Sequence, residues 1–107
     1  MIVRIWRGEA SAEHAPAYRQ FVTQHVFTAI ARIDGHRGAY LLQRDLAGHV
    51  EFLAVTLWES LESIRAFAGD EIETAVVEPE ARAVLSSFDD FVRHYEVAFG
   101  TACGDKK

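Results

Sequence analysis

The sequence is informative first in the residue types that it lacks. It contains no asparagine, one cysteine at Cys103, and lysine only at Lys106 and Lys107. One cysteine excludes a disulfide within the chain, and a domain without lysine excludes Schiff-base chemistry. No glycine-rich phosphate loop and no paired histidines or cysteines at metal-ligand spacing are present. The sequence therefore predicts neither a metal site nor a bound cofactor.

Charge and hydropathy argue against two kinds of partner. The net charge is -5 and the arginines are scattered, so we expect no face for nucleic acid. No apolar run is long enough to cross a membrane, and Met1 to Trp6 is typical of a strand rather than of a signal peptide. We expect a cytoplasmic protein without a membrane partner, with one domain over residues 1–99 and a flexible tail over 100–107.

The stretch from Phe52 to Trp58 is apolar except at Thr56. Because side chains of a strand alternate between its two faces, this strand is apolar on both. A strand with one face in water would alternate apolar and polar residues. The run from Ile2 to Trp6 also places apolar side chains on both faces. The sheet that contains these strands therefore needs cover on both sides.

Hydrophobic spacing and turn residues predict the order strand, helix, strand, strand, helix, strand. One helix is expected from a cap at Ser11 to Ile33, with Pro16 moving its start slightly downstream, and another between Ser60 and Gly69. Residues 71–77 and 80–85 are expected to form short helical turns. The strands are expected at residues 2–7, which Gly8 would end, and at 39–44, 49–58 and 91–99.

This order predicts an α+β fold of the ferredoxin-like βαββαβ type, with an antiparallel four-stranded sheet. Two helices can cover only one face of such a sheet, and the other face would be an apolar patch that monomers rarely carry. We therefore expect a homodimer that packs through its sheet faces and closes a dimeric α/β barrel.

Four local patterns accompany this order: Ile5-Trp6-Arg7-Gly8, Gly35-His36-Arg37-Gly38, the run from Phe52 through Trp58-Glu59-Ser60 to Gly69, and His94-Tyr95-Glu96-Val97. Together they resemble the antibiotic biosynthesis monooxygenase superfamily, the dimeric α/β-barrel proteins, over about residues 1–99. The resemblance implies one of three roles. Some members oxidise polycyclic aromatic substrates with dioxygen and no cofactor, some bind and degrade haem, and many have no assigned activity.

Asparagine separates this chain from the best-known members of that superfamily. The haem-degrading branch uses an asparagine, a tryptophan and a histidine ligand that follows the second helix. Here asparagine is absent, residues 60–90 hold no histidine, and only Trp58 offers a loose match. The best-known cofactor-free members place an asparagine near the substrate oxygen, and this chain lacks that residue too.

Two histidines are candidates for a catalytic base, because an imidazole titrates near neutral pH. His25 flanks the apolar stripe of the first helix, and His94 shares a strand face with Glu96, whose carboxylate would raise its basicity. Each has a structural alternative: His25 as a half-buried helix residue with a backbone or water partner, and His94 as part of a pair that faces solvent.

The expected ligand is a small apolar or aromatic molecule, bound between the sheet and the helices. Arg37 would reach an anionic group or bind the last carbonyls of the preceding helix, and Tyr18 would donate a proton or only pack in the core. Arg4 and Arg44 are expected at the surface or at a dimer contact. Candidates for an aromatic slot, which could equally be ordinary core, are Trp6, Tyr40, Phe52, Trp58 and Phe67.

The leading hypothesis is a monooxygenase-like dimer that oxygenates an aromatic or quinone-type molecule without a cofactor. The first alternative is a non-catalytic protein that binds a small apolar metabolite or haem in the same pocket. The second is a structural or regulatory dimer whose core is filled and which has no pocket.

Overall fold

The computed structural model describes residues 1–101 and shows an α+β fold, as expected. The expectations for the rest of the tail, including Cys103, lie outside the described residues. Four α-helical segments and one π-helical segment accompany five strand segments. The strands are β1 (Ile2–Ser11), β2 (His36–Leu46), β3 (His49–Trp58), β4 (Ser87–Phe88) and β5 (Arg93–Glu96). The helices are α1 (Ala15–Phe21), the π-helix η1 (Val22–Val26), α2 (Phe27–Ile30), α3 (Leu61–Ala68) and α4 (Pro79–Val84).

The sheet is antiparallel throughout and has the order β2-β3-β1-β4, with β5 also paired to β1. This is the strand order of a ferredoxin-like sheet, in which the last strand lies beside the first. The register places Arg4 opposite Thr56 and Trp6 opposite Ala54. Because pairs in register lie on the same face, these four residues share one side of the sheet.

Gly8 does not end the first strand, contrary to expectation, and β1 continues to Ser11. Gly8 has no positive φ angle, so its backbone stays extended. A Cβ atom at this position would lie 2.8 Å from the ring of Trp6. Gly8 therefore provides room for the Trp6 side chain while the strand continues.

The expected last strand at 91–99 is wrong in its boundaries, because two short segments take its place along β1. β4 pairs with Gly8 and Glu9, whereas β5 pairs with the start of β1. Between them the chain leaves the ladder, and the Trp6 indole Nε1 donates a hydrogen bond to the Asp89 carbonyl at 2.7 Å. The irregular segment is thus held by this side chain together with a backbone bond from the Asp89 N–H to the Arg7 carbonyl at 3.0 Å.

The first helical region begins later than Ser11, with Pro16 in its first turn and His14 as the residue before it. The Ser11 hydroxyl still accepts a hydrogen bond from the His14 backbone at 3.3 Å, ahead of the helix. The middle of this region is the π-helix η1, which adds a residue to one turn. Such π turns are rare and often occur at functional sites.

The helix expected between Ser60 and Gly69 is α3, and it has the expected ends. The Ser60 hydroxyl accepts from the backbone N–H of Ser63, and Gly69 follows with a φ of 79°. Gly35 is required beside this corner, because its φ is 92° and a Cβ atom there would lie 2.4 Å from Cβ of Ser63. The strand-corner-helix run from Phe52 to Gly69 is therefore fixed by local chemistry at both ends of α3.

Residues 71–77 do not form the expected helical turn. Thr74 instead pairs with Phe91 as an isolated bridge, and the backbone N–H of Ala75 donates to the Asp90 carbonyl. Only the segment after Glu78 is helical, with Pro79 in the first turn of α4. The 71–77 segment therefore lies alongside the 89–92 segment as a loop.

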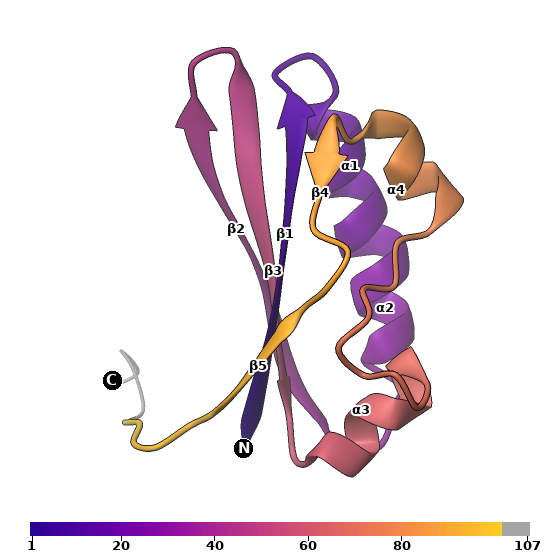
Figure 1. Cartoon of the computed structure of the whole chain (residues 1–107), viewed down its shortest axis with the longest axis vertical. Helices are drawn as coiled ribbons and strands as arrows, with labels where there is room; N and C mark the ends of the chain where they lie inside the picture. The colour runs from indigo at the N-terminus through magenta and orange to yellow at the C-terminus, as the bar shows by residue number, and fades with distance from the viewer. Residues whose placement is uncertain (102–107) are drawn as a thin grey trace.

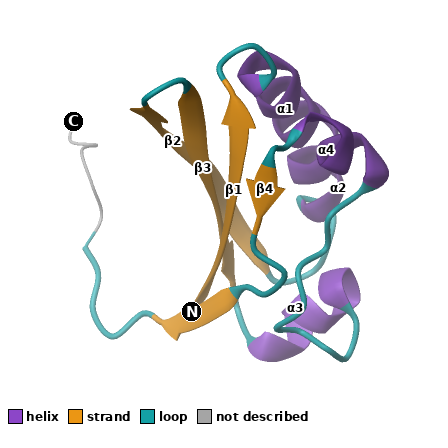
Figure 2. Cartoon of the chain, turned by 45° about the horizontal axis from the view of Figure 1, so that its top comes forward, coloured by secondary structure: helices purple, strands orange, loops and turns teal. Residues whose placement is uncertain are grey.

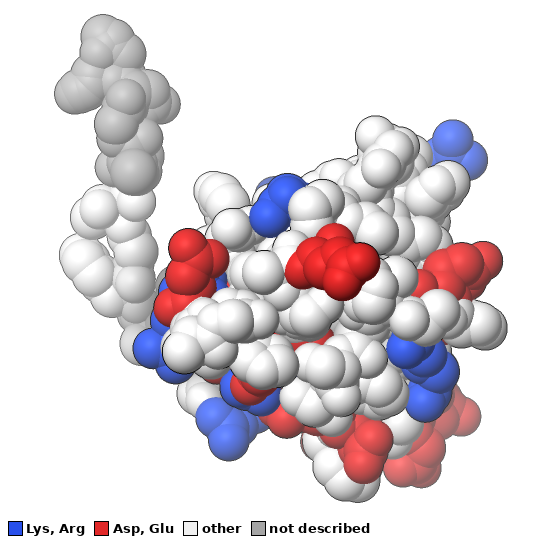
Figure 3. All heavy atoms as spheres, turned by 90° about the horizontal axis from the view of Figure 1, so that it is seen from above, with Lys and Arg blue, Asp and Glu red and all other residues white. Residues whose placement is uncertain are grey.

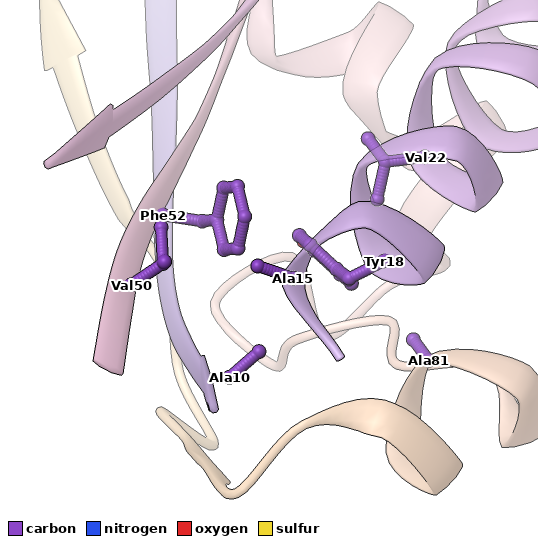
Figure 4. Packing of buried hydrophobic residues seen from close by; sticks show 7 residues of the cluster. All are labelled: Ala10, Ala15, Tyr18, Val22, Val50, Phe52 and Ala81. Atoms are coloured by element: carbon purple, nitrogen blue, oxygen red, sulfur yellow. The ribbon is translucent and has the colours of Figure 1, made fainter. Parts of the chain in front are cut away.

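All the helices lie on one face of the sheet, and the other face carries none in the two views of Figures 1 and 2. The core lies between the layers. Figure 4 shows one part of it, in which Phe52 of β3 points toward α1 and Tyr18. The rings of Tyr18 and Phe52 are 4.8 Å apart, and the second part of the core gathers around Trp58, Ile30 and Ile64.

The face without helices is called here the open face. It carries the side chains that alternate along each strand with those of the helix-covered face. Its apolar part includes two exposed aromatic residues, Tyr40 (62% exposed) and Tyr95 (51% exposed). Its polar end holds Arg7, which bonds to Glu9 and Glu51, and Arg44, which also bonds to Glu51. The other apolar side chains of the three long strands, β1, β2 and β3, on this face are Val3, Ile5, Leu42, Leu46, Leu53, Val55 and Leu57.

Charged side chains of both signs are interspersed on the surface seen from above in Figure 3. No helix within residues 1–101 is long and apolar enough to span a membrane.

Candidate functional site

A cavity of about 70 Å³ lies between the helices and the sheet. Its floor comes from β1 and β3, its roof from the first helical region, and its remaining wall from α3, α4 and the loop before α4. The lining residues are Arg4, Trp6, Tyr18, Phe21, Val22, Val26, Phe27, Ile30, Ala54, Thr56, Phe67, Val76, Val77, Glu78, Ala81 and Val92.

Most of this lining is apolar, and five of its members are aromatic: Trp6, Tyr18, Phe21, Phe27 and Phe67. The rings of Trp6 and Tyr18 are tilted and 6.4 Å apart, so they form a corner rather than a stack. Two roof residues, Val22 and Val26, belong to the π-helix η1. The unusual turn therefore forms part of the cavity wall. Such a lining suits a flat, largely apolar molecule.

Arg4 is the charged centre of the cavity and is only 4% exposed. Its Nη1 donates to the Ile72 carbonyl at 2.5 Å and lies 3.0 Å from Nε2 of His94. Its Nη2 donates to the Thr74 carbonyl at 3.3 Å. The guanidinium carbon also lies 5.6 Å from the ring centre of Phe67, within cation–π distance. These contacts hold Arg4 in one orientation against the 71–77 loop.

No carboxylate within residues 1–101 forms an ion pair with Arg4. Burial lowers the pKa of Arg4 to about 10, so the side chain still carries its charge at neutral pH. Burying a charge without a counterion is costly, and structural ion pairs normally avoid that cost. The cavity therefore contains a positive charge whose electrostatic partner is not supplied by the described chain.

His94 lies behind Arg4 on β5, directly across the ladder from it. Burial, together with the positive charge of Arg4, lowers the pKa of His94, while Glu73 opposes the shift. A neutral imidazole accepts the Arg4 N–H at Nε2 when its proton is on Nδ1. His94 contacts the cavity through Arg4 and is not itself part of the lining.

Two hydroxyl groups add polarity to the cavity. The Thr56 hydroxyl accepts a hydrogen bond from the Trp58 indole at 2.8 Å, which fixes its orientation. Burial raises the pKa of Tyr18, so its phenol stays protonated and can act as a donor. The Tyr18 hydroxyl makes no hydrogen bond to the part of the chain that the structure describes. It is therefore available to a bound molecule.

The structure brings three of the expected binding residues into the lining: Trp6, Tyr18 and Phe67. Two others are fully buried core: Phe52 packs against Tyr18, and Trp58 stacks on Phe67 with ring centres 6.2 Å apart. Trp58 thus supports the cavity wall from behind rather than forming it. Phe52 and Trp58 both belong to the packed core.

The remaining expected residues lie outside the cavity. His25 is exposed on η1, with its ring 5.5 Å from that of Phe21. Arg37 is exposed and forms an ion pair with Glu59 at 3.2 Å. Tyr40 belongs to the open face, because it pairs with Val55 in the register. The catalytic roles expected for His25 and His94 stay predictions, and only His94 lies near the cavity.

Arg4 was expected at the surface or at a dimer contact, and the structure instead buries it in the cavity. The signal that could have found it is its position in β1. Arg4 has the same parity as Ile2 and Trp6, so it points to the same face as those large apolar side chains. Arginine is almost never fully buried unless it is paired, so an arginine on an apolar face is unusual.

Haem can be tested against this lining. No histidine, cysteine or methionine lines the cavity. Tyr18, the remaining residue that could bind iron, favours the protonated form, and Nε2 of His94 already faces Arg4. No group of three metal-ligating side chains occurs within residues 1–101. The residues present therefore do not form a haem site, and we derive no step through haem.

Neither a family model nor a curated protein sequence matches this chain. Solved structures do. A candidate antibiotic biosynthesis monooxygenase from Deinococcus radiodurans is 22% identical, with full coverage of both chains and a TM-score of 0.63. A candidate antibiotic biosynthesis monooxygenase from Bacillus cereus is 14% identical, covers 98% of each chain and has a TM-score of 0.66.

The haem-degrader MhuD from Mycobacterium tuberculosis, solved with two haems in its active site, is 22% identical. The match covers 95% of this chain and 100% of MhuD, with a TM-score of 0.61. At these identities the likeness shows the fold alone. The ferredoxin-like fold that the order of helices and strands predicted is thus confirmed, over nearly the whole length of each protein.

Proposed function

We propose that this chain is a monooxygenase-like enzyme of the antibiotic biosynthesis monooxygenase superfamily, acting on an aromatic or quinone-type small molecule without a cofactor. The observation that carries the proposal is the aromatic cavity between sheet and helices, with Arg4 and Tyr18 among its polar groups. The fold shared with proteins that are named as such monooxygenases supports it.

Cofactor-free oxygenation needs a substrate that can give an electron to dioxygen once it has lost a proton. In the reaction proposed here, the ring CH₂ group of an anthrone and O₂ become a carbonyl group and water, and a hydroquinone and O₂ become a hydroxyquinone and water. The cavity would exclude bulk water, orient the ring and stabilise the deprotonated form. His94 is the better candidate for the base, because it lies beside a cavity residue whereas His25 is exposed. Its Nε2 would have to exchange the Arg4 N–H for the substrate proton.

Oxygen uptake by the purified protein tests this function. A panel of hydroxylated anthrones and hydroquinones should include at least one compound whose oxidation the protein accelerates. Ala54→Phe would fill the cavity floor and should abolish that acceleration, whereas Gln24→Ala on the exposed helix surface should not. No uptake with any member of the panel would contradict the proposal.

The two histidines are tested by separate replacements. His94→Ala should reduce turnover strongly, and His25→Ala should reduce it weakly or not at all. If both variants keep full activity, neither imidazole is the base.

A non-catalytic binding protein is the second candidate, and the absence of any histidine from the cavity lining favours it. In that case aromatic compounds would bind without oxygen uptake. A haem titration distinguishes haem binding from binding of another small apolar molecule. A Soret shift that one histidine replacement removes would support haem binding and contradict the lining described above.

We further propose a homodimer, formed by packing the open faces of two copies. Its support is the apolar surface of that face, including the exposed Tyr40 and Tyr95, which monomers rarely leave in water. A cytoplasmic location is part of the same proposal. Sedimentation at micromolar concentration tests the dimer, and fractionation of the producing cells tests the location.

A further inference from the structure

The guanidinium of Arg4 has unused hydrogen-bonding capacity. An arginine carries five N–H donors. The contacts to Ile72, Thr74 and His94 use both donors of Nη1 and one of Nη2. The Nε donor and the second Nη2 donor have no acceptor among residues 1–101, and the side chain lines the cavity. Two donors and a full positive charge are therefore available there.

The surroundings of Arg4 define what can bind these donors. The loop carbonyls and Phe67 hold the guanidinium but do not neutralise its charge. Glu78 is the one carboxylate among the lining residues; it is exposed and forms no ion pair with Arg4. An oxygen atom with negative charge would supply both the missing acceptor and the missing counterion, and charge-assisted bonds of this kind are the strong ones.

The size and apolarity of the cavity define the rest of the ligand. An apolar cavity of about 150 Å³ accommodates benzene, and the cavity here is about 70 Å³. The enclosed space is thus smaller than one that holds benzene, so a single ring beside Arg4 would extend out of it toward Val76 and Glu78. Val76 is 43% exposed, so the cavity opens to solvent on this side.

We propose that Arg4 is the specificity-determining residue of this cavity, and that it selects aromatic molecules bearing an anionic oxygen, binding the phenolate in preference to the phenol. The inference deepens the proposed function and depends on the cavity being the ligand site. Binding by Arg4 would also explain how the deprotonated substrate is stabilised without a metal, because the guanidinium offers the charge directly.

The test measures binding rather than turnover, so that it can fail separately from the proposed oxygenation. The probes are 4-nitrophenol, whose phenolate absorbs at longer wavelength than its phenol, and 4-nitroanisole, which has the same ring but cannot ionise. The wild-type protein should bind the phenolate about tenfold to a hundredfold more tightly than the ether, the range expected for one charge-assisted hydrogen bond. The spectrum of bound 4-nitrophenol should show ionisation at lower pH than in buffer.

Arg4→Met should remove that preference while leaving 4-nitroanisole binding nearly unchanged. Arg32→Met, which removes an exposed arginine outside the cavity, is the matched control and should keep the preference. Ala54→Phe should abolish binding of both probes. If Arg4→Met does not fold, the wild-type comparison of the two probes still decides the matter.

Equal affinity of the wild-type protein for the two probes would overturn the inference and leave the cavity as an aromatic site. Binding of neither probe would overturn the inference and remove the cavity as a site for single aromatic rings. Tight phenolate binding without oxygen uptake from any anthrone or hydroquinone would support the inference and contradict the oxygenase function.

Discussion

Arginines on the two faces of the sheet have opposite electrostatic surroundings. Arg7, on the open face, lies between two carboxylates, Glu9 and Glu51, and these bonds raise its pKa. Arg4, three residues earlier and on the covered face, has no carboxylate, and burial lowers its pKa to about 10. Arg7 on the open face is thus paired with carboxylates of the same face. Among residues 1–101, Arg4 on the covered face is not so paired, which suits a surface that meets a charged ligand.

The largest expected effect concerns the core behind the cavity. Phe52→Ala would remove a fully buried ring from the covered face and should lower the free energy of unfolding by about 3–5 kcal/mol. Tyr40→Ala on the open face should cost much less at low protein concentration, because Tyr40 is 62% exposed. Urea denaturation of both variants measures the difference. Equal losses would contradict the assignment of the two faces.

The next effect concerns the open face as an interface. Val55→Asp would place a charge in its apolar part and should weaken self-association about a hundredfold or more, because an unpaired carboxylate would be buried. Sedimentation should then show a monomer with unchanged secondary structure by circular dichroism. Gln24→Asp, on the exposed surface of η1, is the matched control and should leave the dimer intact. A wild-type monomer at micromolar concentration would contradict the interface itself.

A smaller effect is expected where neither face is involved. Ser60→Ala would remove the cap of α3 and should lower the free energy of unfolding by about 1 kcal/mol. Neither phenolate binding nor self-association should change. A change in either property would mean that the corner before α3 is coupled to one of the two faces.

The smallest effects are pH-dependent, and they separate the two faces by pH range. The pKa of His94 is lowered in the folded protein, so as the pH falls the unfolded chain binds the proton at a higher pH than the folded protein does. Stability should therefore fall as the pH drops below about 6.5, the ordinary histidine value. Arg4 and Glu73 face this imidazole and act in opposite directions. His94→Gln should remove this part of the pH dependence.

The open face should respond at lower pH. Bonds from Arg44 and Arg7 lower the pKa of Glu51, so its contribution is present above about pH 4.3 and is lost as the pH falls through the folded value. Glu51→Gln should flatten the stability curve in that range alone. Denaturant midpoints between pH 3 and 8 for wild type and both variants measure the two ranges. If both variants changed the stability over the same pH range, the assignment of His94 and Glu51 to two separate ranges would be contradicted.

Much of the fold could be predicted, because its signals are local. Phe52 to Trp58 is apolar on both faces, Ser60 provides a hydroxyl cap, and Gly69 adopts a positive φ. The end of β1 and the division of the last strand could not, since both depend on Trp6 packing over Gly8 and bonding to Asp89. The Trp6–Asp89 bond joins residues 83 positions apart in the chain, so no local signal shows it.

The candidate site was predicted less well than the fold. Tyr18 and Phe67 line the cavity, whereas Trp58 and Phe52 lie behind it and Tyr40 lies on the opposite face. Aromatic composition identifies residues that are buried but not which of their sides faces a cavity. His25 shows the same limit, because the π turn decides which way its side chain points.

The sequence by itself determined that the sheet needs cover on both faces, because side-chain alternation along a strand is a local rule. It also determined the order of helices and strands through caps, glycines and apolar spacing. Only the tertiary structure decided which arginine lacks a counterion. Arg4 meets Ile72, Thr74 and His94, which lie 68 to 90 residues away in the chain. Its charge acquires a role only when the register of β1 and the path of the 71–77 loop close a cavity around it.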